Sequence, residues 1–348
     1  MDSRLTANGS GPPGPDLSRE PRAARWQALA RGFWCPVAVS PATGRMALYG
    51  RNAAGHLLRM TCDGDDAWSG PDALGMPTAH GDGSDVAVPV DWQLAAASDG
   101  TRAWLVARSP DGALLELQCP PDREPAFRSL GTPALDAGGS AMPMGLATAP
   151  AVCGSDGRLD AFALTASGEL LHAVRTGDDW DEFDTLGRPG LQMAGRHPQP
   201  VPLQGGPAAC RCEGGEMAVF LVAQSGLLLF KWWDGTSWSD FASLGSPELR
   251  PAHYPAVTAA APLTGPPAAC SPGGRRLDVF ARGPRGELMR RRWNGETWGR
   301  FESLGMPPSG GARQPLSGTY AVLCPAAGRV DVFASTTDGV LWWLGHVT

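Results

Sequence analysis

Three of the six histidines occur in long segments between β-rich stretches, at His80, His197 and His253. Tyr254 follows the last of them, and arginines occur in or near these segments at Arg196, Arg250 and Arg313. Neutral imidazoles act as general acids, general bases or metal ligands, and guanidinium groups bind carboxylates or phosphates. If the segments share one face of the fold, these side chains form a candidate active site. The alternative, which we favour, is that they are exposed loop residues, because they do not occupy equivalent positions in the repeats of the chain.

Other catalytic or metal-binding motifs are not found in the sequence. There is no HExxH, GxSxG, P-loop or GxGxxG pattern, so the common hydrolase, protease, kinase and dehydrogenase mechanisms have no support. The acidic turns at 63–66 and 82–85 lack the ligand ladder and closing Glu of a calcium loop. We interpret them as solvated turns and expect no metal and no cofactor.

Four of the eight cysteines occupy corresponding positions, 9 or 10 residues before a strand phenylalanine: Cys153, Cys210, Cys270 and Cys324. Equivalent positions in four repeats place these side chains around a common axis, where a free thiol serves as a small apolar group. The alternative of a metal ring is disfavoured, because no CxxC pair or neighbouring histidine completes it. We expect reduced thiols.

Composition limits the class of protein and its partners. The chain of 348 residues is 43% hydrophobic and contains 46 Gly and 33 Pro, which favours an all-β fold with many turns. The net charge is -6, and no dense run of Lys and Arg is present, so we expect no nucleic-acid partner. Residues 1–22 are polar and without an apolar signal region, which predicts a disordered leader and, with no membrane-spanning stretch, a cytoplasmic protein. Release by lysis or a dedicated exporter is the alternative.

A repeat of about 56 to 60 residues covers residues 23–348, which we expect to form a single domain. Each unit contains a short stretch (strand A), an alternating run such as Leu277-Asp278-Val279-Phe280 (strand B), a Gly turn, strand C, and strand D, which ends in Leu-Gly. The dipeptides Asp234-Gly235 and Asn294-Gly295 predict tight C-to-D hairpins. Four antiparallel strands per unit with aromatic residues to wedge between sheets are typical of a β-propeller blade.

The two ends of the chain predict how the ring closes. Residues 340–344 form a last strand C with no strand D after it, and residues 25–29 resemble a strand D with no strand C before it. Pairing the two completes a sixth blade and removes both free edges. The sequence therefore predicts a six-bladed propeller closed by its N-terminal strand, with long D-to-A connectors on one face around a central funnel.

The phrase Leu-x-x-x-x-Trp-Asp/Asn-Gly-x-x-Trp-x-x-Phe-x-Ser-Leu-Gly, with Leu-Asp-Val-Phe before it, resembles the repeat of the PLL-like bacterial propeller lectins and, more distantly, tectonin repeats. This resemblance covers nearly all of the chain from Arg25 onward. It implies a propeller that binds fucose or galactose in pockets between neighbouring blades, through aromatic side chains of the repeat.

Carried over by position, the resemblance implies ligand contacts by five tryptophans: Trp180, Trp233, Trp238, Trp293 and Trp298. Trp68 is a further weak match. The alternative is that most of these indoles are wedges between blades. Only two units keep both tryptophans of the motif, which indicates a lectin with two or three pockets or a ring with one specialised site.

Three functions follow as hypotheses. The first is a carbohydrate-binding, lectin-like module that takes a small-molecule or glycan ligand and has no membrane partner. The second is an enzyme, a cyclase or lyase acting on a natural product, with one active site in the funnel. The third is a scaffold for protein partners. Neither the sugar nor the oligomeric state follows from the sequence.

Overall fold

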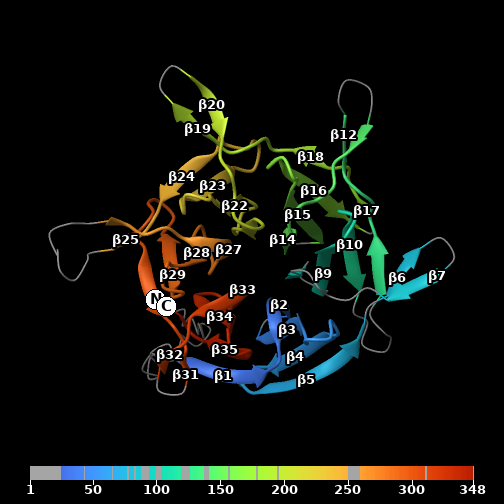
Figure 1. The fold of residues 1–348 in the computed structure, drawn as a ribbon, viewed down its shortest axis with the longest axis vertical. Coiled ribbons are helices and arrows are strands. Elements are labelled where there is room, and N and C mark those ends of the chain that lie inside the picture. The colour runs from blue at the N-terminus through green and yellow to red at the C-terminus, as the bar shows by residue number, and fades with distance from the viewer. Residues whose placement is uncertain are drawn as a thin grey trace, which may run out of the picture.

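The structure is a computed structural model in which residues 25–42, 44–64, 66–76, 78–81, 84–87, 94–98, 103–118, 126–136, 141–155, 157–177, 179–193, 196–249, 259–309 and 312–347 are described. Within these residues the chain is all-β, and six antiparallel sheets form a ring, as predicted (Figure 1). The expected leader, residues 1–22, lies outside the described residues.

Each blade has strand A nearest the axis and strand D at the perimeter (Figure 1). Blade 1 contains β2 (Trp34–Ala42), β3 (Arg45–Arg51), β4 (Leu57–Asp63) and β5 (Trp68–Gly75). Blade 2 contains β8 (Ala95–Ser98), β9 (Ala103–Arg108), β10 (Leu114–Gln118) and β11 (Ala126–Ser129). Blade 3 contains β14 (Ala151–Ser155), β15 (Arg158–Leu164), β16 (Leu170–Thr176) and a divided strand D, β17 (Asp179–Trp180) with β18 (Asp184–Thr185).

The other three blades repeat this order. Blade 4 contains β21 (Ala208–Arg211), β22 (Met217–Val222), β23 (Leu228–Trp233) and β24 (Ala242–Gly245). Blade 5 contains β27 (Thr264–Cys270), β28 (Leu277–Arg282), β29 (Leu288–Trp293) and β30 (Glu302–Gly305). Blade 6 contains β33 (Leu316–Ala326), β34 (Arg329–Thr336), β35 (Val340–Leu344) and β1 (Trp26–Arg31).

The ring closes as the sequence predicts. β1 pairs antiparallel with β35, with Trp26 opposite Leu344 and Ala28 opposite Trp342, so blade 6 is built from both ends of the described chain. This pairing covers the outer edge of β35, which would otherwise expose unpaired backbone groups.

The glycines of the B-to-C turns have the predicted left-handed backbone, with φ between 76° and 86° at Gly55, Gly112, Gly168, Gly226, Gly286 and Gly339. Close packing is a second reason for glycine. A Cβ on Gly226 would lie 2.4 Å from Cα of Pro262, in the segment that enters the next blade. The same segment is held to the turn because the amide of Leu263 donates a hydrogen bond to the carbonyl of Gly226 at 3.1 Å.

The D-to-A connectors differ from the expectation of loops around a central funnel. They contain short hairpins at the outer rim of the ring (Figure 1): β6 (Thr78–Gly81) with β7 (Ser84–Ala87), β12 (Ala134–Asp136) with β13 (Ala141–Pro143), β19 (Gly190–Met193) with β20 (Arg196–Pro200), β25 (Glu248–Leu249) with β26 (Ala259–Ala260), and β31 (Pro308–Ser309) with β32 (Ala312–Arg313). The physical reason is that strand D is the outermost strand of each blade, so each connector begins at the perimeter.

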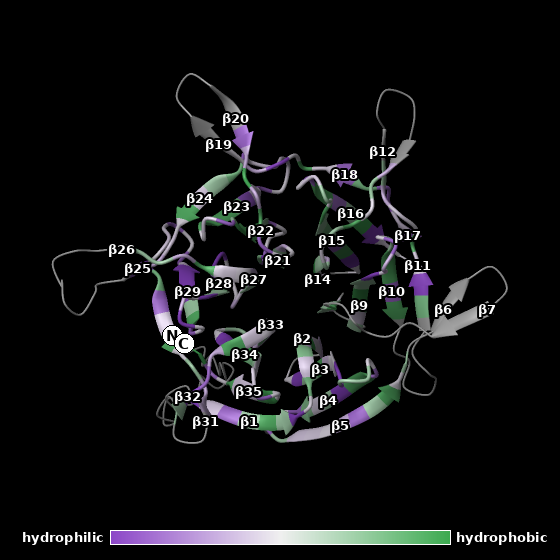
Figure 2. Cartoon of the chain, viewed as in Figure 1, coloured by the Kyte–Doolittle hydropathy of each residue, from purple (hydrophilic) through white to green (hydrophobic). Residues whose placement is uncertain are grey.

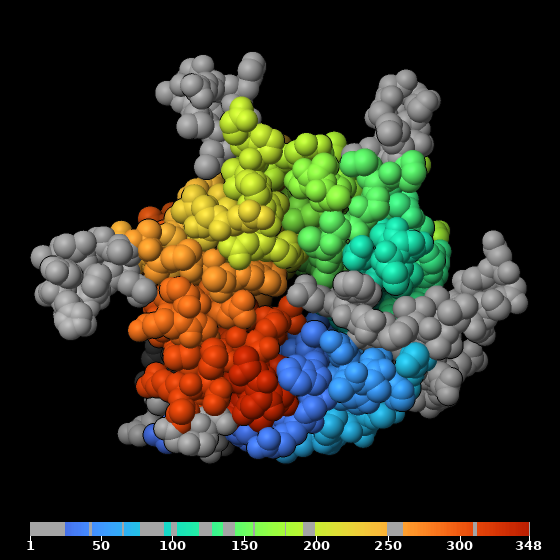
Figure 3. Space-filling view, viewed as in Figure 1, coloured from blue at the N-terminus to red at the C-terminus, as the bar shows by residue number. Residues whose placement is uncertain are grey.

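The hydrophobic core consists of six clusters, and each lies between two neighbouring blades. Between blades 4 and 5, for example, Phe220 and Val222 pack with Val279 and Ala281. Blades follow one another around the ring in chain order, each in contact with the next (Figure 3). Because both faces of a blade are covered, strand B is buried throughout in blade 4.

Candidate functional site

A tryptophan at the start of strand D or in the C-to-D turn before it lies where one blade meets the preceding one. Trp298 of blade 5 lies edge-on against Phe220 of blade 4, with ring centroids 5.9 Å apart. Trp238 of blade 4 contacts Phe162 of blade 3 in the same way at 5.7 Å. The Trp68 ring meets Phe333 at 5.3 Å between blades 1 and 6. These indoles wedge the blades apart at a fixed angle, and edge-to-face contacts of this kind stabilise the interface.

At two interfaces a second tryptophan, from strand C, lies beside the wedge. Trp233 and Trp238 have ring centroids 5.5 Å apart, and Trp293 and Trp298 are 5.6 Å apart. All four indoles are partly exposed. The described residues therefore present two tryptophan pairs in which both indoles are partly exposed, one where blade 4 meets blade 3 and one where blade 5 meets blade 4. At the blade 1–6 interface Trp68 also lies beside a tryptophan, Trp343 at 6.2 Å, but Trp343 is buried.

The C-to-D turn holds each pair together. In blade 4, Oδ1 of Asp234 accepts hydrogen bonds from the amides of Thr236 and Ser237, both at 2.8 Å. These backbone donors and the Thr236 hydroxyl lower the pKa of the Asp234 carboxyl to about 2. In blade 5, Oδ1 of Asn294 plays the same role, accepting from the amide of Thr297 at 2.8 Å. Aspartate or asparagine before glycine thus fixes the turn that brings the two indoles together.

The tryptophan pair of blade 5 also offers a free donor. Nε1 of Trp293 is buried and has no hydrogen-bond partner among the described groups. A buried donor without an acceptor is costly and is normally satisfied by water or a ligand. Because this nitrogen is shielded from solvent, a ligand hydroxyl reaches it only when neighbouring side chains move. Within the described part of the chain, Nε1 of Trp26, Trp68 and Trp343 is buried without a partner in the same way.

Trp180 has different surroundings. Its Nε1 donates to Oε2 of Glu116 in blade 2 at 2.8 Å, and the same oxygen accepts from Nε of Arg175 at 3.1 Å. The Arg175 guanidinium lies 3.7 Å from the ring centroid of Trp104. Glu116 and Arg175 are buried, so the protein's own groups occupy the space between blades 2 and 3.

The connector residues proposed for catalysis are not brought together where they are described. His80 lies on β6 beside blade 2, whereas Arg196 and His197 lie on β20 ahead of blade 4, both at the rim (Figure 1). Arg313 is exposed on β32. His253, Tyr254 and Arg250 lie outside the described residues.

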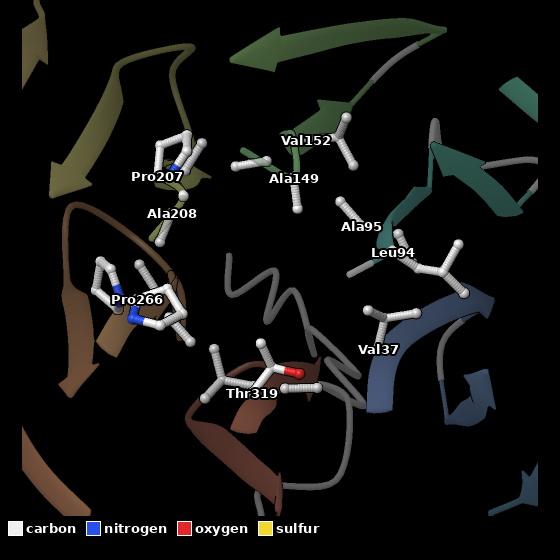
Figure 4. A pocket seen from close by; sticks show the side chains of 18 of the residues that line it. Val37, Leu94, Ala95, Ala149, Val152, Pro207, Ala208, Pro266 and Thr319 are labelled. Carbon is white, nitrogen blue, oxygen red and sulfur yellow. The ribbon is translucent and has the colours of Figure 1, made fainter. Parts of the chain in front are cut away.

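The central channel is narrow, and most of the side chains that line it are small and apolar. Its cavity has a volume of about 130 Å³ and is lined by strand A and the residues before it. Figure 4 shows Val37, Leu94, Pro207, Pro266 and Thr319 around this space. Burial raises the pKa of the Tyr320 hydroxyl, which donates to the Pro266 carbonyl at 2.8 Å. Among the described lining residues, Tyr320 has the only titratable side chain, and its hydroxyl is already bound to a backbone carbonyl.

The four cysteines of the strand A position are on β14, β21, β27 and β33, and three of them, Cys153, Cys210 and Cys270, are buried. Burial raises the pKa of Cys153 to about 12 and is also the main cause of the raised pKa of Cys210. The thiols of Cys153 and Cys210 are therefore protonated at neutral pH and act as packing groups, as predicted. Among the described residues no group of three metal-binding side chains is found.

Sequence reasoning missed a set of buried charges on strand B. Asp160, Asp278 and Asp331 occupy the polar position of the Leu-Asp-x-Phe run and are buried between blades. The signal was the repeated pairing of this aspartate with a preceding arginine, as in Arg158 and Arg329. Alternation alone suggested a solvent-facing position, but both faces of a blade are covered.

The strands differ in their hydropathy. β29 appears hydrophilic in Figure 2 because it contains Arg290, Arg291 and Arg292, whereas β10 is largely apolar.

The described residues contain no helix that could cross a bilayer.

Solved lectin structures share this fold. A fungal lectin from Aleuria aurantia, described as a six-bladed β-propeller with a novel fucose recognition mode, aligns with 90% of this chain and 93% of its own at 16% identity and a TM-score of 0.58. The BP39L lectin from Burkholderia pseudomallei aligns with 93% of this chain and 98% of its own at 19% identity and a TM-score of 0.52. AofleA from Arthrobotrys oligospora aligns with 92% of this chain and 85% of its own at 13% identity and a TM-score of 0.55.

Other comparisons limit what this similarity means. No protein-family model and no curated protein sequence matches the chain. The Aleuria aurantia lectin is described as a six-bladed propeller and as fucose-specific, in agreement with the resemblance carried by the repeat. At such low identity the similarity establishes the fold.

Proposed function

We propose that the protein is a carbohydrate-binding, lectin-like propeller of the PLL-like type, with ligand pockets at the blade 3–4 and blade 4–5 interfaces. The observation that carries this proposal is the pair of partly exposed indoles at each of these interfaces, Trp233 with Trp238 and Trp293 with Trp298. A flat aromatic face suits the apolar side of a pyranose, and a few placed polar groups give orientation. The neighbouring propeller of the Aleuria lectin was solved, as a mutant, in complex with α-methyl-L-fucoside.

The polar groups at these pockets differ between the two interfaces. At the blade 4–5 interface, Nε1 of Trp293 supplies a free donor. At the blade 3–4 interface, His172 stacks on Phe162 at 4.6 Å and meets the edge of Trp238 at 5.8 Å. We infer that the two pockets have unequal affinities, because a donor that finds an acceptor only in the bound state favours binding.

Trp180 has a structural role in this proposal, since Glu116 already accepts its N–H. Arg196, Arg250 and Arg313 stay predicted contacts from the connectors. No observation favours the cyclase or lyase alternative.

We further propose that the ligand is met in a bacterial cytoplasm, without nucleic-acid or membrane partners. The resemblance of the repeat to bacterial propeller lectins supports the source, and the net charge of -6 with no basic run supports the lack of a nucleic-acid partner. Fractionation of expressing cells tests it: recovery of the protein in the medium or with membranes contradicts this location.

A glycan array tests the lectin function. We expect binding to a restricted set of glycans with terminal fucose or galactose, and failure to bind any glycan at high protein concentration would contradict the proposal. Calorimetry with the best glycan then compares Trp293→Phe with Trp180→Phe. The first substitution removes the free donor and is expected to weaken binding about tenfold, whereas the second leaves affinity unchanged.

A further inference from the structure

A second pocket, which contains none of the tryptophans, opens on the face of the ring that carries the A-to-B turns. Its volume is about 600 Å³, and it is lined by the turn regions of blades 3, 4 and 5. Four of its ten lining residues are glycines, and Gly214 and Gly273 have φ values of 95° and 114°. These turns require glycine and leave space where side chains would otherwise project. A pocket of this size accommodates a small-molecule ligand.

The wall of this turn-face pocket contains two arginines that share one carboxylate. Arg158 donates to Asp160 from Nη2 at 2.8 Å and from Nε at 3.1 Å. Arg211 also donates to Asp160 from Nη2, and its Nη1 donates to the Gly215 carbonyl at 3.1 Å. Asp160 is fully buried and additionally pairs with Nε2 of His172 at 2.9 Å. One negative charge therefore serves two guanidinium groups.

The strand B aspartates of two other blades also lie beside arginines, with a second carboxylate nearby. In blade 6, Arg329 lies between two carboxylates, at 2.7 Å from Asp331 and 2.7 Å from Asp66. In blade 5, Arg290 and Arg292 share Asp278 and Glu302. At the blade 3–4 site two guanidinium groups pair with a single buried carboxylate, Asp160, and the charge of Asp181 also acts on Arg158. Its outer arginine, Arg158, has a side chain that is 43% exposed.

A carboxylate on the opposite wall sets the second requirement for a ligand. Glu213 is exposed and lies toward blade 5, where a Cβ on Gly273 would be 3.6 Å from its Oε1. Its oxygen can accept a hydrogen bond from a ligand hydroxyl but repels an anionic group placed beside it. The two walls together fit a ligand with an oxyanion at one end and hydroxyls at the other.

We propose that the turn-face pocket binds a small hydroxylated acid, such as an acidic sugar or a sugar phosphate, with its oxyanion on Arg158 and Arg211 and a hydroxyl on Glu213. Guanidinium groups held by a buried partner are pre-organised for charge-assisted hydrogen bonds to carboxylate or phosphate. The turn-face pocket contains none of the paired tryptophans. Its binding of an acid is therefore independent of whether the blade interfaces bind sugar.

Isothermal titration of the full chain with glucuronate, glucose 6-phosphate and glucose tests the proposal. We expect at least one of the two acids to bind and Arg158→Gln to weaken that binding at least about tenfold. Arg45→Gln is the matched control, because Arg45 begins strand B of blade 1 and pairs with Asp63 on the exposed surface. This control is expected to leave the affinity unchanged. Whichever acid binds identifies the oxyanion as carboxylate or phosphate.

Glu213→Gln separates the electrostatic role from a structural one. Gln keeps an oxygen that can accept the ligand hydroxyl but removes the negative charge that repels the oxyanion, so binding of the acid is expected to tighten, whereas general damage to the turn would weaken it. If Arg158→Gln does not fold, two single variants are measured in its place. Arg158→Lys is expected to weaken binding of the acid, and Glu213→Gln is expected to tighten it. Equal binding of glucose and both acids, no binding of any acid, or equal affinities of the Arg158 and Arg45 variants would overturn the proposal.

Discussion

The indole of Trp298 in blade 5 meets the ring of Phe220 in blade 4 at an interplanar angle of 88°. Trp238 on Phe162 and Trp68 on Phe333 repeat the arrangement at angles of 83° and 78°. One edge of the indole is therefore used to join two blades, while part of the side chain is exposed at the blade boundary. Trp298 therefore contributes both to the stability of the ring and to the proposed ligand site.

Replacement of the wedge is expected to destabilise the ring. Trp298→Ala removes the contacts with Phe220 and Phe230 and should lower the free energy of unfolding by about 2 to 4 kcal/mol, because a large partly buried aromatic is lost. Trp298→Phe keeps part of the edge contact and should cost less than half as much. Urea unfolding followed by fluorescence measures both, and a Trp298→Ala variant as stable as the parent would show that the wedge is dispensable.

Two turn glycines should respond differently to the same substitution. Gly226→Ala combines a φ of 82° with a Cβ only 2.4 Å from Pro262, so the entering segment must move. Gly235→Ala has a φ of 100° but no atom within 4 Å of its Cβ. We expect about 1 kcal/mol of destabilisation at Gly235 and at least about twice that at Gly226. Thermal unfolding compares the variants, and equal losses would contradict the close-packing argument.

The buried Asp160 should make stability depend on acid. Burial alone would raise the pKa of its carboxyl, but hydrogen bonds from His172 and Arg158 and the charge of Arg211 lower the pKa well below its usual value. In the unfolded chain the pKa of an aspartate is about 3.9. The stabilisation is therefore complete above that pH and is lost as the pH falls below it toward the lower folded-state pKa.

Asp160→Asn tests this dependence. Removing the charge leaves the largely buried guanidinium of Arg211 without its carboxylate and should cost about 3 to 5 kcal/mol at neutral pH. Its stability should also fall less steeply than that of the parent protein below pH 4. Unfolding free energies measured from pH 7 to pH 2 report both effects. Parallel pH curves for the two proteins would refute the assigned role.

Deletion of residues 1–31 removes β1 and exposes the edge of β35. The apolar strand Val340–Leu344 is fully buried in the closed ring, and an uncovered edge of this kind pairs with other chains. We expect a lower melting temperature and self-association, measured by light scattering after size-exclusion chromatography. Deletion of residues 1–22, which keeps β1, is the control and should remain as stable as the full chain.

Much of the fold follows from the sequence because its signals are local. The Asp234-Gly235 and Asn294-Gly295 hairpins, the turn glycines and the unmatched strands at residues 25–29 and 340–344 each specify a pairing that the structure contains. Six-fold repetition then makes each local signal reinforce the others.

The candidate site was harder to predict because it depends on contacts between units. The approach of Trp298 to Phe220, of Trp180 to Glu116 and of Arg211 to Asp160 joins residues more than 50 positions apart, at positions that need not match between blades. Nothing in the alternation of strand B distinguishes a buried aspartate from a solvated one. We expected the connectors to surround the axis because the sequence shows how long they are. It does not show that each connector begins at the perimeter of the ring, where strand D lies.

A crystal structure of the protein with its best glycan tests the central claim most directly. The account predicts a sugar ring against the exposed indoles of Trp293 and Trp298, with a hydroxyl accepting from Nε1 of Trp293, and a second sugar at Trp233 and Trp238. A glycan bound in the central channel beside Thr319, with both tryptophan pairs empty, would contradict it.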